Sequence, residues 1–421
     1  MLAAGRIARD AFREQFWPDE LGTAATLAVA MNILGERYAW QAYRVLNFLV
    51  ANLGLVLFHV GCVRLMRGSQ TRAFIFSAAL ALWVFPSALA KTPNTYSMAT
   101  AWMMVFYGLL TIFFARFREA SKDAIPLSRT SYGTHGLLLG ACVALASAYR
   151  SQPCLLGLFL LPAYGAYMVL ALRDGSQRRQ ALVLTAGFVV GQAVASLPTV
   201  AMRMYLCGQP RLTRPVFWHT VASGLGVYPH NGLQMPFWDA GIFEYVARMD
   251  PFVRPYSPRY EALLKESLLR HLGERPGDFL KAGVIRAQFL FRNSHPGFMP
   301  DAYSASFRVL NCILFLLSLA CIARGLRGRC LETLPLIACW TYFYLSVLVV
   351  YLPAWSYVIY GTLAAFPMFA CLYSSAMGDV QMPRDASGVR GIGAKALGRL
   401  LPLGVTFFWL FPMLHVMGGP E

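Results

Sequence analysis

The sequence is poor in charged residues, and acidic residues are the scarcer kind. Only 14% of its 421 residues are charged, with 20 Asp and Glu against 37 Lys and Arg. A soluble domain carries roughly a quarter charged residues. Because 57% of the residues are hydrophobic, the composition argues against an ordinary soluble protein. It predicts an all-α polytopic membrane protein.

Two further absences narrow the function. The nine cysteines show no spacing typical of a metal site or a disulfide framework. Eight of them lie in or beside apolar runs, which is typical of small core residues. No Gly-rich nucleotide-binding loop is present. The net charge is +17. In so apolar a chain, basic residues more often set the orientation of the protein in the membrane, so we expect no nucleic-acid partner.

Ten apolar runs approach the length of about 20 residues that a membrane-spanning helix needs. None of them contains Asp or Glu in its interior. We expect spans at 40–66, 73–90, 97–115, 134–149, 153–172, 180–203, 305–323, 333–352, 356–375 and 400–417. The GxxxG pair Gly187 and Gly191, inside the sixth run, predicts close packing against another helix.

The connections between these runs alternate in charge. One set is short and basic, and positive loops stay in the cytoplasm. Its members are Arg64/Arg67/Arg72, Arg116/Arg118/Lys122/Arg129, Arg173/Arg178/Arg179, Arg324/Arg327/Arg329 and Arg384/Arg390/Lys395/Arg399. The other set is 91–96, 150–152, the long, nearly neutral 204–304, and 353–355. The pattern predicts a membrane protein whose large loop is extracytoplasmic, in a periplasm or its equivalent. The expected location is the bacterial inner membrane.

This alternation divides the chain into four parts: 1–39, the first six spans (40–203), the large loop (204–304) and the last four spans (305–421). It places the first part outside, although no span precedes it. We therefore expect a further span that is encoded upstream, has been lost, or is supplied by a protein partner. Residues 3–16 in this segment predict an amphipathic helix lying on anionic lipid, or otherwise a frayed tail.

The large loop divides into two portions. Residues 206–256 are rich in Gly, Pro and aromatic residues, and we expect irregular structure there. Residues 258–292 predict two amphipathic helices broken at Gly273 and Pro276. The first helix is expected to present one apolar face, made of Leu263, Leu264, Leu268 and Leu269.

Four stretches resemble the C-type (GT-C) glycosyltransferase superfold, whose members include protein O-mannosyltransferases and lipid A aminoarabinose transferases. They are residues 34–116, YRSQPCLLGLFLLP (149–162), FWHTVASGLGVYPHNG (217–232) and RHLGERPGDFLKAGVIR (270–286). The resemblance implies transfer of a sugar from a polyprenyl-phosphate donor to an acceptor at the outer membrane face. No cofactor other than this lipid-linked donor is expected, and the sequence leaves the metal requirement, the sugar and the acceptor open.

Such a transfer needs a carboxylate to orient or deprotonate the acceptor hydroxyl and cations to hold the leaving phosphate. The resemblance makes Asp19 the candidate carboxylate, with Glu20 as its substitute. The alternative is that both cap the helix that follows. Lys91 and Arg150 are candidate phosphate ligands at predicted outer membrane ends, with Tyr96 as a neighbour. Ordinary contact with lipid headgroups is the alternative for both cations.

The stretch 217–239 carries two further candidates. His219 is a candidate ligand of a donor or acceptor phosphate, and Asp239 is a candidate partner of a sugar hydroxyl. The alternative is a structural loop whose aromatic side chains pack while its glycines form turns. Residues His230 and Asn231 are expected to form a turn.

Two other functions compete with sugar transfer. A non-catalytic protein on the same scaffold would bind or present a lipid-linked glycan for another enzyme. A secondary transporter is less favoured, because coupled transport needs ionisable groups within the membrane, and the apolar runs hold no Asp or Glu in their interiors.

Overall fold

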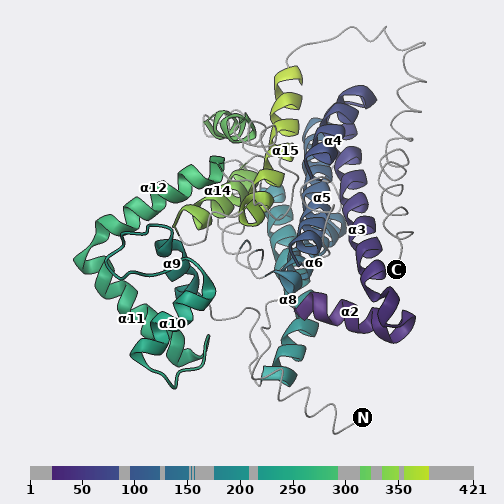
Figure 1. The fold of residues 1–421 in the computed structure, drawn as a ribbon. Coiled ribbons are helices and arrows are strands. Elements are labelled where there is room, and N and C mark those ends of the chain that lie inside the picture. The colour runs from purple at the N-terminus through teal and green to yellow at the C-terminus, as the bar shows by residue number, and fades with distance from the viewer. Residues whose placement is uncertain are drawn as a thin grey trace, which may run out of the picture. The chain divides into compact units, whose positions relative to one another are not determined.

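The computed structural model describes residues 21–84, 95–123, 129–150, 153, 156, 175–207, 217–292, 313–323, 334–349 and 355–378. Nearly all of them are helical, and none of these described residues lies in a β-strand. The all-α class is therefore confirmed. The chain forms two compact units (Figure 1). The first, here called the bundle, draws on residues 1–210, 318–337 and 363–421, and the second on residues 211–317 and 338–362.

Helices make up the described part of the bundle. They are α2 (Leu21–Leu34), α3 (Glu36–Leu65), α4 (Gln70–Val84), α5 (Thr95–Asp123), α6 (Arg129–Tyr149), α8 (Gly175–Cys207) and the later part of α15 (Trp355–Gly378). Gly35 separates α2 from α3 with a φ of 83°, a left-handed conformation that suits glycine. The helix α14 (Leu334–Val349) contributes residues to both units.

Three helices are long and apolar enough to cross a membrane. They are Glu36–Leu65, Ser97–Glu119 and Arg178–Tyr205, which coincide with the predicted spans 40–66, 97–115 and 180–203. Shorter apolar helices cover Leu21–Leu34, Ile313–Ala323 and Pro335–Leu345. Most of 153–172, all of 400–417 and the amphipathic segment 3–16 lie outside the described residues. The total of ten spans stays a prediction.

Glycine contacts hold α3 and α5 together side by side (Figure 1). A Cβ atom on Gly54 would lie 2.6 Å from the Met104 Cβ, and one on Gly61 would lie 2.7 Å from the Thr111 Cγ2. Both residue numbers rise together along the interface, so the two helices run parallel. The backbones approach so closely only because these positions carry no side chain.

Close contacts at glycines also join α6 to α8. A Cβ on Gly140 would overlap the Phe188 carbonyl, and one on Gly191 would overlap the Leu137 carbonyl. The predicted packing role of Gly191 and its GxxxG partner Gly187 is therefore confirmed. The helices α6 and α8 also run parallel, which agrees with the prediction that one further span separates them.

The bundle has a basic end. The end of α5 meets the start of α6 through Arg116 and His135, whose Nη1 and Nε2 atoms are 3.4 Å apart. Since α3 is parallel to α5 and α8 is parallel to α6, Arg64 and Arg179 belong to this same end. At the opposite end, α2 contacts Tyr149 through Thr26. Three basic connections thus gather at one end of the bundle, as the charge alternation predicts.

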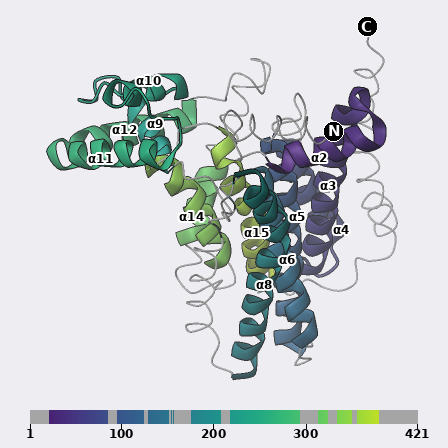
Figure 2. The same ribbon diagram turned by 90° about the horizontal axis from the view of Figure 1, so that it is seen from below.

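Residues 217–292 of the second unit form a four-helix domain, here called the insert. Its helices are α9 (Phe217–Gly226), α10 (Asp239–Met249), α11 (Pro258–Glu274) and α12 (Pro276–Arg292). The helix α9 lies between α11 and α12 (Figures 1 and 2). The prediction of irregular structure for 206–256 was wrong where α9 and α10 form. The α9 residue Gly226 lets the Pro236 backbone approach closely, because a Cβ at this position would overlap the Pro236 carbonyl. This contact explains a glycine inside a helix, where glycine is otherwise unfavourable.

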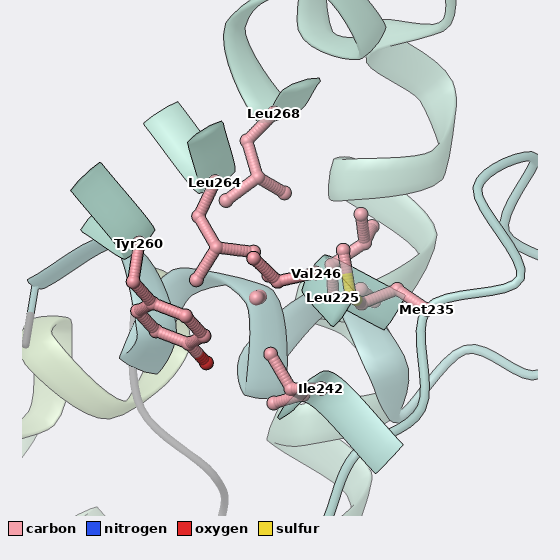
Figure 3. Packing of buried hydrophobic residues seen from close by; sticks show 9 residues of the cluster. Leu225, Met235, Ile242, Val246, Tyr260, Leu264 and Leu268 are labelled. Atoms are coloured by element: carbon pink, nitrogen blue, oxygen red, sulfur yellow. The ribbon is translucent and has the colours of Figure 1, made fainter. Parts of the chain in front are cut away.

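Leucines from α11 form the centre of the insert. Leu264 and Leu268 are fully buried and point toward side chains of α9 and α10, including Leu225 and Val246 (Figure 3). The predicted break between α11 and α12 is confirmed at residue 275. Leu269 was wrongly assigned to the apolar face, because it is exposed. It lies about 100° around the helix from Leu268, away from the core.

Candidate functional site

The predicted phosphate and carboxylate residues are only partly described. Asp19, Glu20 and Lys91 lie outside the described residues. Tyr96 lies in the first turn of α5, but its side chain is outside the description as well. Arg150 directly follows α6, is half-buried, and donates its backbone N–H to the Ala146 carbonyl over 2.9 Å.

The structure brings His219 and Asp239 together. The sequence singled out each residue separately, and they are 20 positions apart. The His219 Nε2 lies 3.2 Å from the Asp239 Oδ1. The His219 side chain is 8% exposed, whereas the Asp239 side chain is 65% exposed. A buried imidazole therefore holds a carboxylate that faces solvent.

Tyr260 fixes the orientation of this imidazole. Its hydroxyl lies 2.6 Å from the His219 Nδ1. Because an ionised carboxylate can only accept, Nε2 donates to Asp239. In the neutral form of the ring, Nδ1 then accepts from the Tyr260 hydroxyl. Both ring nitrogens are thus used, and rotation of the ring would break both hydrogen bonds.

Aromatic rings pack around His219. The Phe243 ring stacks on it at a centroid distance of 5.5 Å, and the Tyr256 ring lies at 4.7 Å. Tyr256 has a φ of 62°, a left-handed conformation that costs energy for a non-glycine residue. Tyr256 immediately precedes Ser257, whose hydroxyl caps α11 by accepting the Tyr260 N–H. The start of α11 therefore fixes both Tyr256 and Tyr260.

Glu261 anchors the helix that carries His219. Its carboxylate accepts the backbone N–H of Trp218 over 2.8 Å and that of His219 over 3.2 Å. These groups lie in the first turn of α9, where a helix has no internal acceptors for its N–H groups and favours negative charge. Together, Asp239, His219, Tyr260 and Glu261 are called the Asp239 cluster.

A second buried carboxylate, Asp278, holds the other side of the insert. It accepts the Gly232 N–H over 2.9 Å and contacts the His271 Nε2 at 2.9 Å. The Arg275 Nε lies 3.5 Å away. The Gly232 hydrogen bond, followed by those neighbours, holds the pKa of Asp278 below its ordinary value. Asp278 thus ties the turn at 228–231 to the junction of α11 and α12.

Turn formation at His230 and Asn231 is confirmed. The Asn231 N–H bonds to the Tyr228 carbonyl over 3.1 Å, and the Asn231 side chain also holds both backbone groups of Met235. In α12, burial lowers the pKa of Arg286 to about 10, so this guanidinium is still charged at neutral pH.

Of the three carboxylates Asp239, Glu261 and Asp278, Asp239 is the one that can contact a ligand. Glu261 and Asp278 accept backbone N–H groups inside the insert. Asp239 faces solvent, and it can accept a hydrogen bond or a proton from a ligand hydroxyl. Within the described ranges, no group of three or more His, Cys, Asp or Glu side chains is placed to hold a metal ion.

Sequence reasoning missed Tyr260, Glu261, His271 and Asp278. The Ser-Pro pair at 257–258 indicates a helix start, so the position of Tyr260 and Glu261 in a first turn was predictable. Their partners lie some 40 residues earlier in the chain, and no local pattern links the two segments.

Comparisons with family models, with curated proteins and with solved structures found no match to this chain. Functional assignment therefore depends on the residues themselves.

Proposed function

We propose that the protein is an integral-membrane glycosyltransferase that moves a sugar from a polyprenyl-phosphate donor to an acceptor. The proposal includes a bacterial inner membrane, ten spans, and an extracytoplasmic location for the insert. The GT-C resemblance and the three helices long enough to cross a membrane support it.

The observation that carries the proposal is the held carboxylate of Asp239. A carboxylate with a fixed orientation is suited to accept the proton of an acceptor hydroxyl. In the proposed reaction, the hydroxyl oxygen bonds to the anomeric carbon of the sugar, and the hydroxyl proton passes to Asp239. The bond from that carbon to the phosphate oxygen breaks, and its electron pair leaves with the lipid phosphate.

Cations have to balance the charge that develops on this phosphate. Lys91 and Arg150 are the proposed cations because both belong to connections on the predicted outer side. Asp19 and Glu20 remain the carboxylates that the resemblance proposes. Asp239 is the alternative to them, and its contact with His219 is described.

A second candidate function is non-catalytic binding of a lipid-linked glycan. It is favoured by the structural use of acidic residues in the insert, where Glu261 and Asp278 both hold backbone N–H groups. On this alternative, Asp239 accepts a hydrogen bond from a glycan hydroxyl but no proton.

The test is transfer of radiolabelled sugar from polyprenyl phosphate in membranes that contain the full chain. We expect Asp239→Asn and Arg150→Ala each to lower turnover by about a hundredfold, the lower range for loss of a proton acceptor or of a transition-state charge contact. The matched control is Glu266→Gln, because Glu266 is 68% exposed and pairs with Arg270 in its own helix.

Unchanged turnover in Asp239→Asn would remove Asp239 from the mechanism. Retention of labelled glycan lipid by the wild-type protein without any transfer would favour the binding function instead. A loss of activity in Glu266→Gln equal to that in Asp239→Asn would show that general damage to the insert is being measured.

A further inference from the structure

The basic end of the bundle contains a second group of charged side chains, far along the helices from Arg150. Arg116 donates from Nη1 to the His135 Nε2 over 3.4 Å. The His135 Nδ1 lies 2.8 Å from the Ser131 carbonyl, which can only accept. In this arrangement His135 is a neutral acceptor that orients Arg116.

Arg64 adds a second guanidinium from α3. The close contact of Gly61 with Thr111 brings this end of α3 beside the end of α5. The acidic neighbour of Arg64 is Glu119, at 4.0 Å, and both side chains are exposed. Such a pair at the outer limit of ion-pair distance contributes little. Arg64 and Arg116 therefore leave a net positive charge beside Glu119.

Further contacts join the helices that carry these side chains to α15. Arg118 donates to the Cys371 carbonyl over 3.2 Å and also bonds to Ser375, which fixes α15 to α5. Ser374 bonds to the Leu65 carbonyl, next to Arg64. Directly beyond, Arg67 has a φ of 53°, a left-handed conformation in the turn that leads to α4. Four helices thus meet in a defined arrangement around two arginines.

We propose that Arg64 and Arg116 bind the phosphate of an anionic phospholipid at the basic end of the bundle. A guanidinium presents donors in a planar fork that matches phosphate oxygens. Both arginines lie near the ends of helices long enough to cross a membrane, which is the level of lipid phosphates. The site is independent of the proposed sugar transfer, and it lies at the opposite end of the bundle from Arg150.

The experiment measures lipid binding to the purified full-length protein by native mass spectrometry. The probes are phosphatidylglycerol, phosphatidylcholine and inorganic phosphate at matched ionic strength. We expect tighter binding of phosphatidylglycerol than of phosphatidylcholine. We expect Arg64→Gln and Arg116→Gln each to weaken phosphatidylglycerol binding about tenfold, the effect of losing one charge-assisted contact.

Two further variants make the test specific. Arg179→Gln removes an exposed arginine from α8 at the same end of the bundle, and it should bind phosphatidylglycerol as the wild type does. Arg116→Lys keeps the charge without the planar fork and should lie between wild type and Arg116→Gln. Melting temperatures without added lipid identify any variant that fails to fold.

Wild-type affinity in folded Arg64→Gln and Arg116→Gln would overturn the site. An equal loss in Arg179→Gln would also overturn it, because attraction to the lipid would then be diffuse. Displacement of phosphatidylglycerol by inorganic phosphate at low millimolar concentration would overturn the lipid assignment in favour of a soluble phosphate.

Discussion

The bundle and the insert are both helical, yet they bury their helices by different means. In the bundle, glycines bring helix backbones into contact, as at Gly54 and Gly140. In the insert, leucines fill a core, and buried carboxylates bind backbone N–H groups around it. The difference fits the proposed membrane location. In that location, lipid gives no hydrophobic drive between the apolar helices of the bundle, so close packing has to hold them, whereas water drives the leucines of the insert together.

The largest effect is expected where a side chain would separate two bundle helices. Gly140→Ala places a Cβ against the Phe188 carbonyl, and neither backbone can move without breaking the α6–α8 contact. We expect destabilisation of about 3 kcal/mol or more, the upper range for overpacking. Thermal unfolding of the purified protein in detergent measures it.

The matched control is Gly133→Ala, two glycines earlier on the same helix. A Cβ there meets its nearest atom, the Val183 Cγ1, at an ordinary 3.5 Å. It should be neutral or slightly stabilising, since Ala favours helix over Gly by about 1 kcal/mol. If both variants behave alike, glycine contact does not distinguish the bundle.

A smaller effect is expected at the buried carboxylate Asp278, and it should depend on pH. The pKa of this group is lowered in the folded protein from 3.8. The stabilisation that ionised Asp278 gives to the folded protein is therefore fully present above the unfolded pKa of 3.8. It is lost as the pH falls through the lower pKa of the folded protein. Unfolding measured between pH 2 and 6 should show this acid loss in the wild type and a weaker one in Asp278→Asn.

Glu266→Gln serves as the control for this acid response, because the exposed Glu266–Arg270 pair contributes little. It should reproduce the wild-type dependence on pH. An undiminished acid loss in Asp278→Asn would mean that other carboxylates control the acid stability of the protein.

Patterns that repeat within one segment were predictable from the sequence. The spans 40–66, 97–115 and 180–203 followed from apolar length, and the break between α11 and α12 followed from Gly273 and Pro276. The helix contact at Gly187 and Gly191 was predictable because a four-residue spacing places two small residues on one helix face.

Features that depend on distant partners were not predictable. The glycines of α9 suggested a turn. Their packing role was hidden because the Pro236 backbone, which packs on Gly226, lies ten residues later in the chain. His219 and Asp239 were both candidates, but their contact required the folding of α10 against α9. Tyr260 and Glu261, which hold that pair in place, belong to a third helix and carried no signal of their own.

The most direct test of the account is the membrane side on which each region lies. Glu266→Cys in the insert and Arg179→Cys in α8 both place a thiol at an exposed position. Each is made in a variant whose native cysteines are replaced, and intact cells with a permeable outer membrane are treated with a membrane-impermeant maleimide. The account predicts labelling at position 266 before the inner membrane is opened and at position 179 only afterwards. Labelling of both thiols from the same side would contradict it.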